Sequence, residues 1–161
     1  MARGDKIAAF ALSEPDAGSD VAAMQLQATP ARADCVADEP DGALMLDGRK
    51  TWISNGGIAD FYTLFARSGD GSRGISCFLV PGDAPGVKYG RNELKMGWRA
   101  QPTRTISFEG VRIPAGNRIG PEGQGFVYAM KGLDGGRLNI ASCSLGAAQA
   151  ALEQSLRHVE E

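Results

Sequence analysis

Turn dipeptides divide residues 7–119 into short apolar stretches, and this division limits the fold more than any other feature of the sequence. Asn55-Gly56 and Asp70-Gly71 are examples, and such pairs supply the positive backbone φ angles that tight hairpins need. The expected strands are 7–12, 24–34, 43–53, 61–67, 75–80, 87–89, 105–108 and 111–113. Repeated short strands at this spacing predict a mainly β chain that opens with an antiparallel β-barrel or sandwich domain.

The pattern changes after Gly123, where turn residues become rare. Apolar residues then recur at steps of three and four, as one face of a helix requires. These residues are Leu138, Ala141, Leu145, Ala148, Leu152, Leu156 and Val159. We expect a short helix at 124–133, a break or cap at 134–136 and a helix that continues to Glu161. Its apolar stripe requires a partner, which is the sheet, a helical bundle outside this chain or an oligomer contact.

Composition and charge exclude several functional classes. The chain has 17 basic and 19 acidic residues and a net charge of −2, so bulk electrostatics do not favour nucleic acid or anionic membranes. No apolar run approaches the roughly 20 residues of a membrane-spanning helix, and the first residues do not resemble a signal peptide. We therefore expect a soluble intracellular protein with no nucleic-acid and no membrane partner.

The cysteines and the histidine do not indicate metal or nucleophilic chemistry. Cys35, Cys77 and Cys143 are odd in number, far apart and without a C-x-x-C pair, so we expect three small buried side chains. His158, the single histidine, falls on the expected helix, where a solvated or packed role is favoured over a catalytic triad. No metal site is expected.

One glycine motif imitates a nucleotide-binding fingerprint. Residues 69–74 read GDGSRG, which fits G-x-G-x-x-G. That fingerprint requires a helix after its third glycine, because the helix N-terminus binds the pyrophosphate. Residues 75–80 instead predict a strand, so we interpret the motif as a hairpin loop.

A second polar stretch combines an apolar strand with a tight turn. Residues 10–20 read FALSEPDAGSD, in which Pro15 and Gly18 favour a turn and Ser13 and Ser19 offer hydroxyl groups. Consecutive amides in such a turn can form an anion-binding nest, which would suit a phosphate or a cofactor. The alternative is a strand-to-helix connection in which Ser19 or Asp20 caps a short helical turn.

Residues 12–20 resemble the flavin-contacting signature of the acyl-CoA dehydrogenases. Further matches follow in order along the chain: WISNGG at 52–57, KMGW at 95–98, GQGF at 123–126 and DGGR at 134–137. Residues 101–104 and 133–146 are similar to the isobutyryl-CoA dehydrogenase branch. The resemblance implies a middle β-domain at 1–122, followed at 123–161 by the start of a truncated C-terminal helical domain.

The resemblance also implies a cofactor, FAD, and the residues that contact it. The implied FAD-binding residues are Phe10, Ala11, Leu12, Ser13, Gly18, Ser19, Trp52, Ile53 and Ser54. An indole at Trp52 can cover one face of the flavin ring, and Ser54 can donate a hydrogen bond near flavin N5. Without the motif, a core position would be the better interpretation of Trp52, and Trp98 keeps a core or surface-packing interpretation.

The corner at 134–137 matches the segment through which the family contacts its substrate. The implied substrate-binding residues are Ser19, Asp134, Gly135, Gly136 and Arg137. A guanidinium at Arg137 can bind carbonyl or phosphate oxygens of acyl-CoA in a fixed fork. An equally weighted alternative is an ion pair between Asp134 and Arg137 at helical spacing.

The implied reaction is α,β-desaturation of a short, branched acyl-CoA, with electrons passed to an electron-transfer flavoprotein. The base must be a glutamate, and in a minority of the family it stands one residue before the arginine that matches Arg137. Gly136 occupies that position, so we expect no catalytic residue in this chain and no activity from the chain alone. The complete protein is expected to be a homotetramer in the bacterial cytoplasm or the mitochondrial matrix. The alternatives are an acyl-CoA oxidase or nitroalkane-oxidising relative, and a stand-alone FAD- or CoA-binding module.

Overall fold

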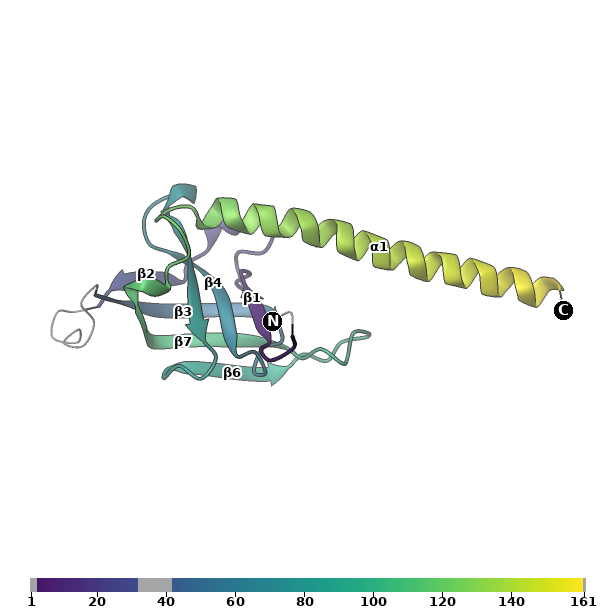
Figure 1. Cartoon of the computed structure of the whole chain (residues 1–161), viewed down its shortest axis with the longest axis horizontal. Helices are drawn as coiled ribbons and strands as arrows, with labels where there is room; N and C mark the ends of the chain where they lie inside the picture. Colours follow the sequence, from purple (N-terminus) through teal and green to yellow (C-terminus); the bar gives the residue numbers. More distant parts are fainter. Residues whose placement is uncertain (1–2, 32–41, 161) are drawn as a thin grey trace. The chain divides into compact units, whose positions relative to one another are not determined.

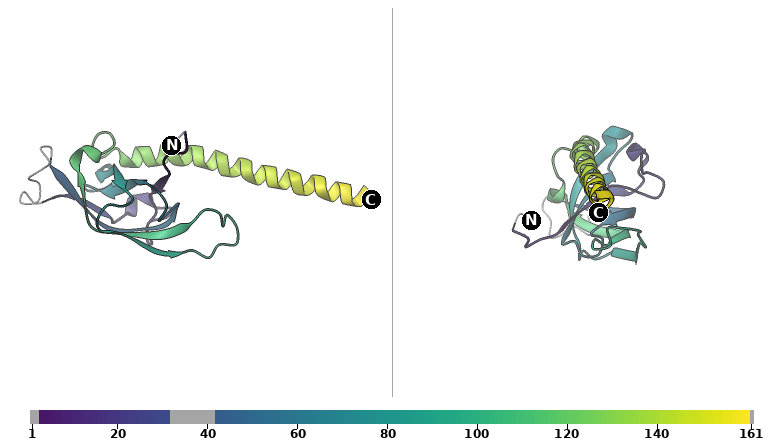
Figure 2. Two further views of the ribbon diagram at one scale, coloured as in Figure 1. Left: turned by 60° about the horizontal axis from the view of Figure 1, so that its bottom comes forward. Right: turned by 90° about the vertical axis from the view of Figure 1, so that its right-hand side faces the viewer.

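The computed structural model describes residues 3–31 and 42–160. It contains one curled sheet of seven strands and a long helix (Figures 1 and 2). The strands are β1 (Ala8–Ala11), β2 (Gln27–Pro30), β3 (Ala43–Ser54), β4 (Phe61–Arg67), β5 (Ile75–Pro81), β6 (Val87–Asn92) and β7 (Thr103–Pro114). The 3-10 turns are η1 (Val21–Ala23), η3 (Ser72–Gly74) and η4 (Ala115–Asn117), and the helix is α1 (Gly125–Glu160). The mainly β architecture followed by a helix is confirmed.

The strand order is β1-β4-β2-β3-β7-β6, and β5 pairs with β4. The β2–β3, β3–β7, β4–β5 and β6–β7 pairs are antiparallel, whereas β1 and β2 both run parallel to β4. β1 is held in register partly by Asp60, which accepts hydrogen bonds from the Ile7 amide and the Lys6 ammonium, both at 2.7 Å. Compact units form at Met1–Phe126 and Val127–Glu161. The expected boundary at residues 122/123 remains a prediction.

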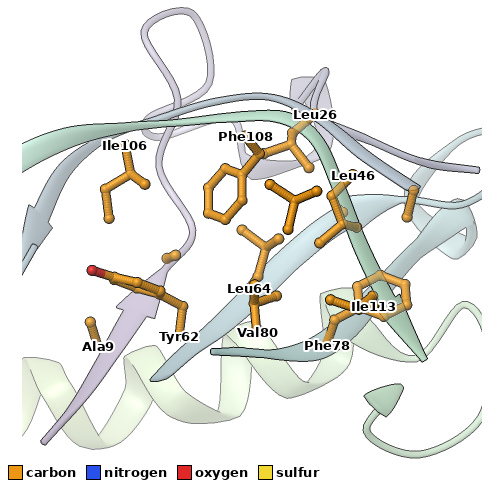
Figure 3. Packing of buried hydrophobic residues seen from close by; sticks show 14 of the residues in the cluster. Ala9, Leu26, Leu46, Tyr62, Leu64, Phe78, Val80, Ile106, Phe108 and Ile113 are labelled. Carbon is orange, nitrogen blue, oxygen red and sulfur yellow. The ribbon is translucent and has the colours of Figure 1, made fainter. Parts of the chain in front are cut away.

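The core fills the concave side of the sheet. Side chains from β4 and β5, such as Leu64, Val80 and Phe78, point toward Leu46, Phe108 and Ile113 from β3 and β7 (Figure 3). These residues are all nearly inaccessible to solvent. Burying one such side chain stabilises a fold by about 1.5–3 kcal/mol, so this cluster stabilises the curled sheet.

Some expected strand limits were wrong. Residues 105–108 and 111–113 belong to one strand, β7, which passes through Gly110 at φ +61° without a turn. The Gly110 amide donates to Asp47 Oδ1 at 2.7 Å, and β3 pairs with β7 on both sides of this point. The strand expected at 24–34 is β2, which begins only at Gln27, and residues 32–34 lie outside the described part of the chain.

The expected helix break was also wrong. α1 runs through residues 134–136, and neither Gly135 nor Gly136 takes the left-handed conformation of a helix cap. A glycine inside a helix costs only about 1 kcal/mol relative to alanine, and the surrounding residues carry the helical hydrogen bonds across the pair. The apolar side chains of the expected stripe lie exposed on α1, among them Leu145 and Val159.

The glycine motif at 69–74 closes a hairpin. Gly69 and Gly74 join β4 to β5 through η3, and the Gly74 carbonyl accepts hydrogen bonds from the Ser68 amide at 2.7 Å and the Gly69 amide at 3.0 Å. A Cβ atom at Gly74 would lie 2.0 Å from the Gly69 carbonyl oxygen, so only glycine fits there. The expectation of a hairpin rather than a nucleotide fingerprint is confirmed.

The cysteines differ from one another. Cys77 is buried as expected, and burial raises the pKa of its thiol to about 11. Cys143 is exposed, contrary to expectation, because it lies on α1 in a region where every described side chain from Asp134 onward is exposed. His158 lies exposed near the end of the same helix, and Cys35 falls outside the described residues. Within the described residues, no cluster of side chains could hold a metal ion.

Candidate functional site

The turn after β1 presents open backbone to solvent. It is closed by reciprocal backbone hydrogen bonds between Glu14 and Ala17, at 3.1 and 3.2 Å. Gly18 and Ser19 follow on the exposed side, and nothing lies within 4 Å of a Cβ placed on Gly18. In the described structure their amides have no protein acceptor, and the Ser13 and Ser19 hydroxyls have no protein partner. The turn therefore leaves donors free for an anionic ligand.

The alternative interpretation of this turn is correct in part. Asp20 stands at the N-cap position of η1, but its side chain makes no capping hydrogen bond. Arg67 holds the short turn instead, with its guanidinium donating to the carbonyls of Ala22 at 2.6 Å and Met24 at 3.0 Å. The Ser19 hydroxyl and the Asp20 carboxylate are thus not used in capping.

Trp52 occupies an irregular point of β3. The register with β7 shifts between Lys50 and Ile53, and Trp52 adopts φ +54° within this bulge. Left-handed backbone is rare for bulky side chains and often marks functional positions. The indole is 61% exposed, whereas the neighbouring Ile53 is buried and Ser54 is exposed. The bulge therefore turns an aromatic face and a hydroxyl-bearing residue toward solvent, and a core position for Trp52 is ruled out.

The turn and the bulge lie next to each other. The Thr51 amide donates to the Ser13 carbonyl at 2.9 Å, and the Asn55 side-chain amide donates to the Ala8 carbonyl at 3.2 Å. The structure thereby brings together two motifs that are about forty residues apart in the sequence, Ser13 and its neighbours and the segment around Trp52. Ala11 at the end of β1 and the following Leu12 are buried, and the half-exposed Phe10 of β1 packs its ring 4.9 Å from that of Phe65.

A buried ion pair underlies this junction. Lys50 Nζ lies 2.8 Å from Glu14 Oε1 and donates to the Leu12 carbonyl at 2.9 Å. The Lys50 side chain is 0% exposed and that of Glu14 is 6% exposed. The two Glu14 oxygens also accept hydrogen bonds from the amides of Gln25 at 2.6 Å and Leu26 at 3.1 Å. One carboxylate therefore fixes both ends of the 15–24 loop.

Burial lowers the pKa of the Lys50 ammonium from 10.5 to about 8, although the facing Glu14 carboxylate favours the charged form. The other atoms near Nζ are the Leu12 carbonyl oxygen and, at 3.9 Å, the neutral Met24 sulfur. The pair is not predicted from the sequence, in which Glu14 belongs to a polar turn and Lys50 to a separate strand. The sequence does contain a signal for the burial of Lys50, although not for its partner, because Lys50 stands four residues after Leu46 and hence on the apolar side of an alternating strand.

The chain matches two models of one known protein family. Residues 9–111 match the family model described as acyl-CoA dehydrogenase, middle domain. The chain belongs to the acyl-CoA dehydrogenase family. Residues 123–161 match a second model of the family, the acyl-CoA dehydrogenase C-terminal domain. The fold and the family resemblance are therefore confirmed together.

Comparison with individual proteins shows how much of their length this chain covers. Mitochondrial isobutyryl-CoA dehydrogenase of Bos taurus is 46% identical over 149 residues, which cover 92% of this chain and 34% of the bovine protein. The structure of butyryl-CoA dehydrogenase from Megasphaera elsdenii matches with a TM-score of 0.82 and 42% identity over 91% of this chain and 37% of that one. A chain described under the electron transferring flavoprotein of Acidaminococcus fermentans matches with a TM-score of 0.77 and 39% identity, over 87% of this chain and 35% of that one. The chain thus spans about a third of the length of each of these three matches.

The remaining predicted site residues lie on α1. Asp134 and Arg137 form an ion pair at 3.0 Å, and both side chains are about two-thirds exposed. Gly135 and Gly136 lie between them on the helix, with no side-chain or backbone atom within 4 Å of a Cβ at either position. The ion pair predicted as an alternative is present, and it leaves both polar groups open to solvent.

The sheet residues suit the flavin cofactor that is the norm for acyl-CoA dehydrogenases. The unpartnered amides at Gly18 and Ser19 are donors for a phosphate group, and the exposed Trp52 indole offers a ring face. Ser13 and Ser54 bring hydroxyls that no described protein group uses.

Within the part of the chain that the structure describes, no helix is both long and apolar enough to cross a membrane.

Proposed function

We propose that this chain supplies the flavin-contacting wall of an FAD-dependent acyl-CoA dehydrogenase, together with the first helix of its C-terminal domain. The observation that carries the proposal is the junction of Ser13 with Thr51, which places the open turn beside the outward-facing Trp52. Such an arrangement offers one ligand both hydrogen-bond donors and an aromatic surface. We propose Phe10, Ala11, Leu12, Gly18, Ser19, Ile53 and Ser54 as the further residues of this wall.

In this proposal, the residues of the wall bind and orient the cofactor. The amides of Gly18 and Ser19 would hold a pyrophosphate oxygen, while the hydroxyls of Ser13 and Ser54 would donate to polar edges of the ring. Trp52 would cover one ring face and exclude water from it. FAD, when bound, supplies the hydride acceptor for oxidation of a carbon–carbon bond.

The substrate proposed is a short, branched acyl-CoA, with isobutyryl-CoA as the first candidate. Support comes from the 46% identity to the bovine isobutyryl-CoA dehydrogenase. Asp134, Gly135, Gly136 and Arg137 would contact the CoA, with the guanidinium binding carbonyl or phosphate oxygens. Ser19 would contact both ligands.

The proton-abstracting base is proposed to lie outside these 161 residues. Gly136 carries no carboxylate, so the chain alone is expected to bind ligands without desaturating them. The complete protein would pass electrons to an electron-transfer flavoprotein and would form a homo-oligomer, a tetramer by family resemblance. Its location would be the mitochondrial matrix in a eukaryote or the cytoplasm in a bacterium.

The test is a titration of the purified chain with FAD, followed by addition of isobutyryl-CoA. We expect saturable binding that changes the flavin spectrum, and then no loss of the flavin absorbance near about 450 nm. Failure to bind FAD would contradict the role of the wall. Bleaching at an enzymatic rate would contradict the placement of the base outside the chain.

A further inference from the structure

The Glu14–Lys50 pair joins the three segments that build the proposed flavin wall. Lys50 lies on β3, two residues before Trp52, and its ammonium donates to the carbonyl of Leu12, the residue that follows β1. Glu14 begins the turn that leads to Gly18 and Ser19. The pair thus connects the strand end, the anion-binding turn and the bulge at a single buried point.

Glu14 sets the position of the loop that carries Gly18 and Ser19. Its carboxylate accepts the Gln25 amide through Oε2 and the Leu26 amide through Oε1, while its own backbone bonds Ala17. Both ends of the 15–24 loop are therefore fixed to the same side chain. A shift of this carboxylate would move the free amides of the loop relative to the sheet.

Lys50 sets the distance between that loop and Trp52. β1 pairs with β4 rather than with β3, so β1 and the bulge are joined by a few discrete hydrogen bonds instead of a ladder. The Lys50 bonds to Leu12 and Glu14 are two of them, and the neighbouring Thr51 bond to Ser13 is another. Loss of the ammonium would leave the two halves of the wall joined by the Thr51 bond to Ser13 and the Asn55 side-chain bond to Ala8.

A buried ion pair is a costly way to stabilise a core, because removing both charges from water offsets most of their mutual attraction. Apart from Glu14 itself, the atoms near the Lys50 ammonium are the Leu12 carbonyl oxygen and the Met24 sulfur, and neither of these requires a charge. Directional bonds to fixed partners, by contrast, define one arrangement of the segments that meet there. The geometry is therefore better explained by placement than by stability.

We infer that Glu14 and Lys50 are positioning residues for the flavin site, which hold the Gly18–Ser19 turn and the Trp52 bulge at the separation at which both contact one FAD molecule. This inference rests on the function proposed above. It adds a dependence of cofactor affinity on a charge that does not itself touch the cofactor.

The charge state of Lys50 provides a test that separates placement from stability. Because burial lowers the Lys50 pKa to about 8, the ammonium loses its proton between neutral and mildly alkaline pH. The folded chain holds the Lys50 proton less tightly than the unfolded chain does. The free energy of unfolding therefore increases as the pH rises. If the pair positions the wall, FAD affinity falls over the same interval, so the two quantities change in opposite directions.

The experiment measures the FAD dissociation constant and the unfolding midpoint of the 161-residue chain from about pH 6.5 to about pH 9.5. It includes Lys50→Met, Glu14→Gln and the control Lys88→Met, which removes a lysine from the solvent-exposed pair with Glu109. Circular dichroism establishes at each pH that the protein is folded. The wild type should bind about tenfold more weakly at the alkaline end, as expected for the loss of a charge-assisted hydrogen bond.

Folded Lys50→Met should bind FAD weakly at every pH, with a flat profile, and Lys88→Met should follow the wild type. If Lys50→Met does not fold, the wild-type profile and Glu14→Gln decide the question. A wild type that binds FAD with an affinity independent of pH, or a folded Glu14→Gln with wild-type affinity, would overturn the inference alone. A wild type that binds no FAD at any pH would overturn the proposed function, and the inference with it.

Discussion

Replacement of Lys50 by methionine should destabilise the fold far more than replacement of an exposed lysine. Lys50→Met keeps most of the apolar stem but removes the ammonium, which bonds Glu14 Oε1 at 2.8 Å and the Leu12 carbonyl at 2.9 Å. Glu14 is then left 6% exposed without its partner cation. Removing one member of a buried ion pair costs about 3–5 kcal/mol, which is a large share of the stability of a domain of this size.

The matched control is Lys88→Met. Lys88 pairs with Glu109, but the two side chains are 64% and 55% exposed. Water and salt screen such a pair, so its loss should cost less than about 1 kcal/mol. Urea unfolding followed by circular dichroism at about pH 7 gives both free energies from the same type of substitution.

A free energy of unfolding for Lys50→Met that lies within about 1 kcal/mol of that for Lys88→Met at neutral pH would refute the reasoning.

Three further predictions concern separate parts of the chain. Because burial lowers the Lys50 pKa from 10.5 to about 8, the wild type should become more stable as pH rises from about 8 toward 10.5; the increment is obtained by subtracting the pH profile of Lys50→Met, and equal profiles would contradict it. Gly48→Ala should cost about 2 kcal/mol or more in urea unfolding, because Gly48 has φ +143° and a Cβ there would lie 2.7 Å from the Leu26 Cα. Gly116→Ala, at a position with nothing within 4 Å, is its control and should change stability by no more than about 0.5 kcal/mol. Arg137→Ala should change stability by less than about 0.5 kcal/mol, because its ion pair with Asp134 is exposed, and it should weaken CoA binding in calorimetry; unchanged CoA affinity would remove Arg137 from the proposed substrate site.

The fold was largely predictable from local signals where those signals agree with the long-range pairing. Asp70-Gly71 marked the β4–β5 connection correctly, because Gly71 adopts φ +63° in the loop. Gly110 follows a glutamate in a similar context but stays inside β7, because β3 pairs with the strand on both sides of it. The hydrogen bonds of a central strand outweigh a local turn preference, and the sequence around Gly110 does not contain that information.

In the helix, a local signal predicts an interruption that does not occur. Two successive glycines at 135–136 predict an interruption by propensity alone, at about 1 kcal/mol for each residue. α1 nevertheless runs through both glycines, over a total length of 36 residues. The cost of two glycines is small compared with ending and restarting a helix, because a new nucleus would have to form.

Some features of the candidate site could be predicted from the sequence, and others depend on long-range pairing. Residues adjacent in the sequence, such as Ser13, Gly18 and Ser19, could be predicted because the turn that exposes them is local. The Glu14–Lys50 pair could not, because its partners are 36 residues apart and meet only when β1 and β3 are placed in the sheet. The bulge that turns Trp52 outward likewise depends on the register between β3 and β7.

The most direct measurement of the central claim compares FAD binding by Trp52→Ala and Trp98→Ala. Both tryptophans are mainly exposed, at 61% and 65%, and both have positive φ angles, of 54° and 55°, so the two substitutions should perturb the fold similarly. If the wall around Trp52 contacts the flavin ring, Trp52→Ala should weaken FAD binding by about tenfold or more, whereas Trp98→Ala should bind as the wild type does. Equal affinities in the two variants, or wild-type affinity in Trp52→Ala, would contradict the assignment of this face to the flavin.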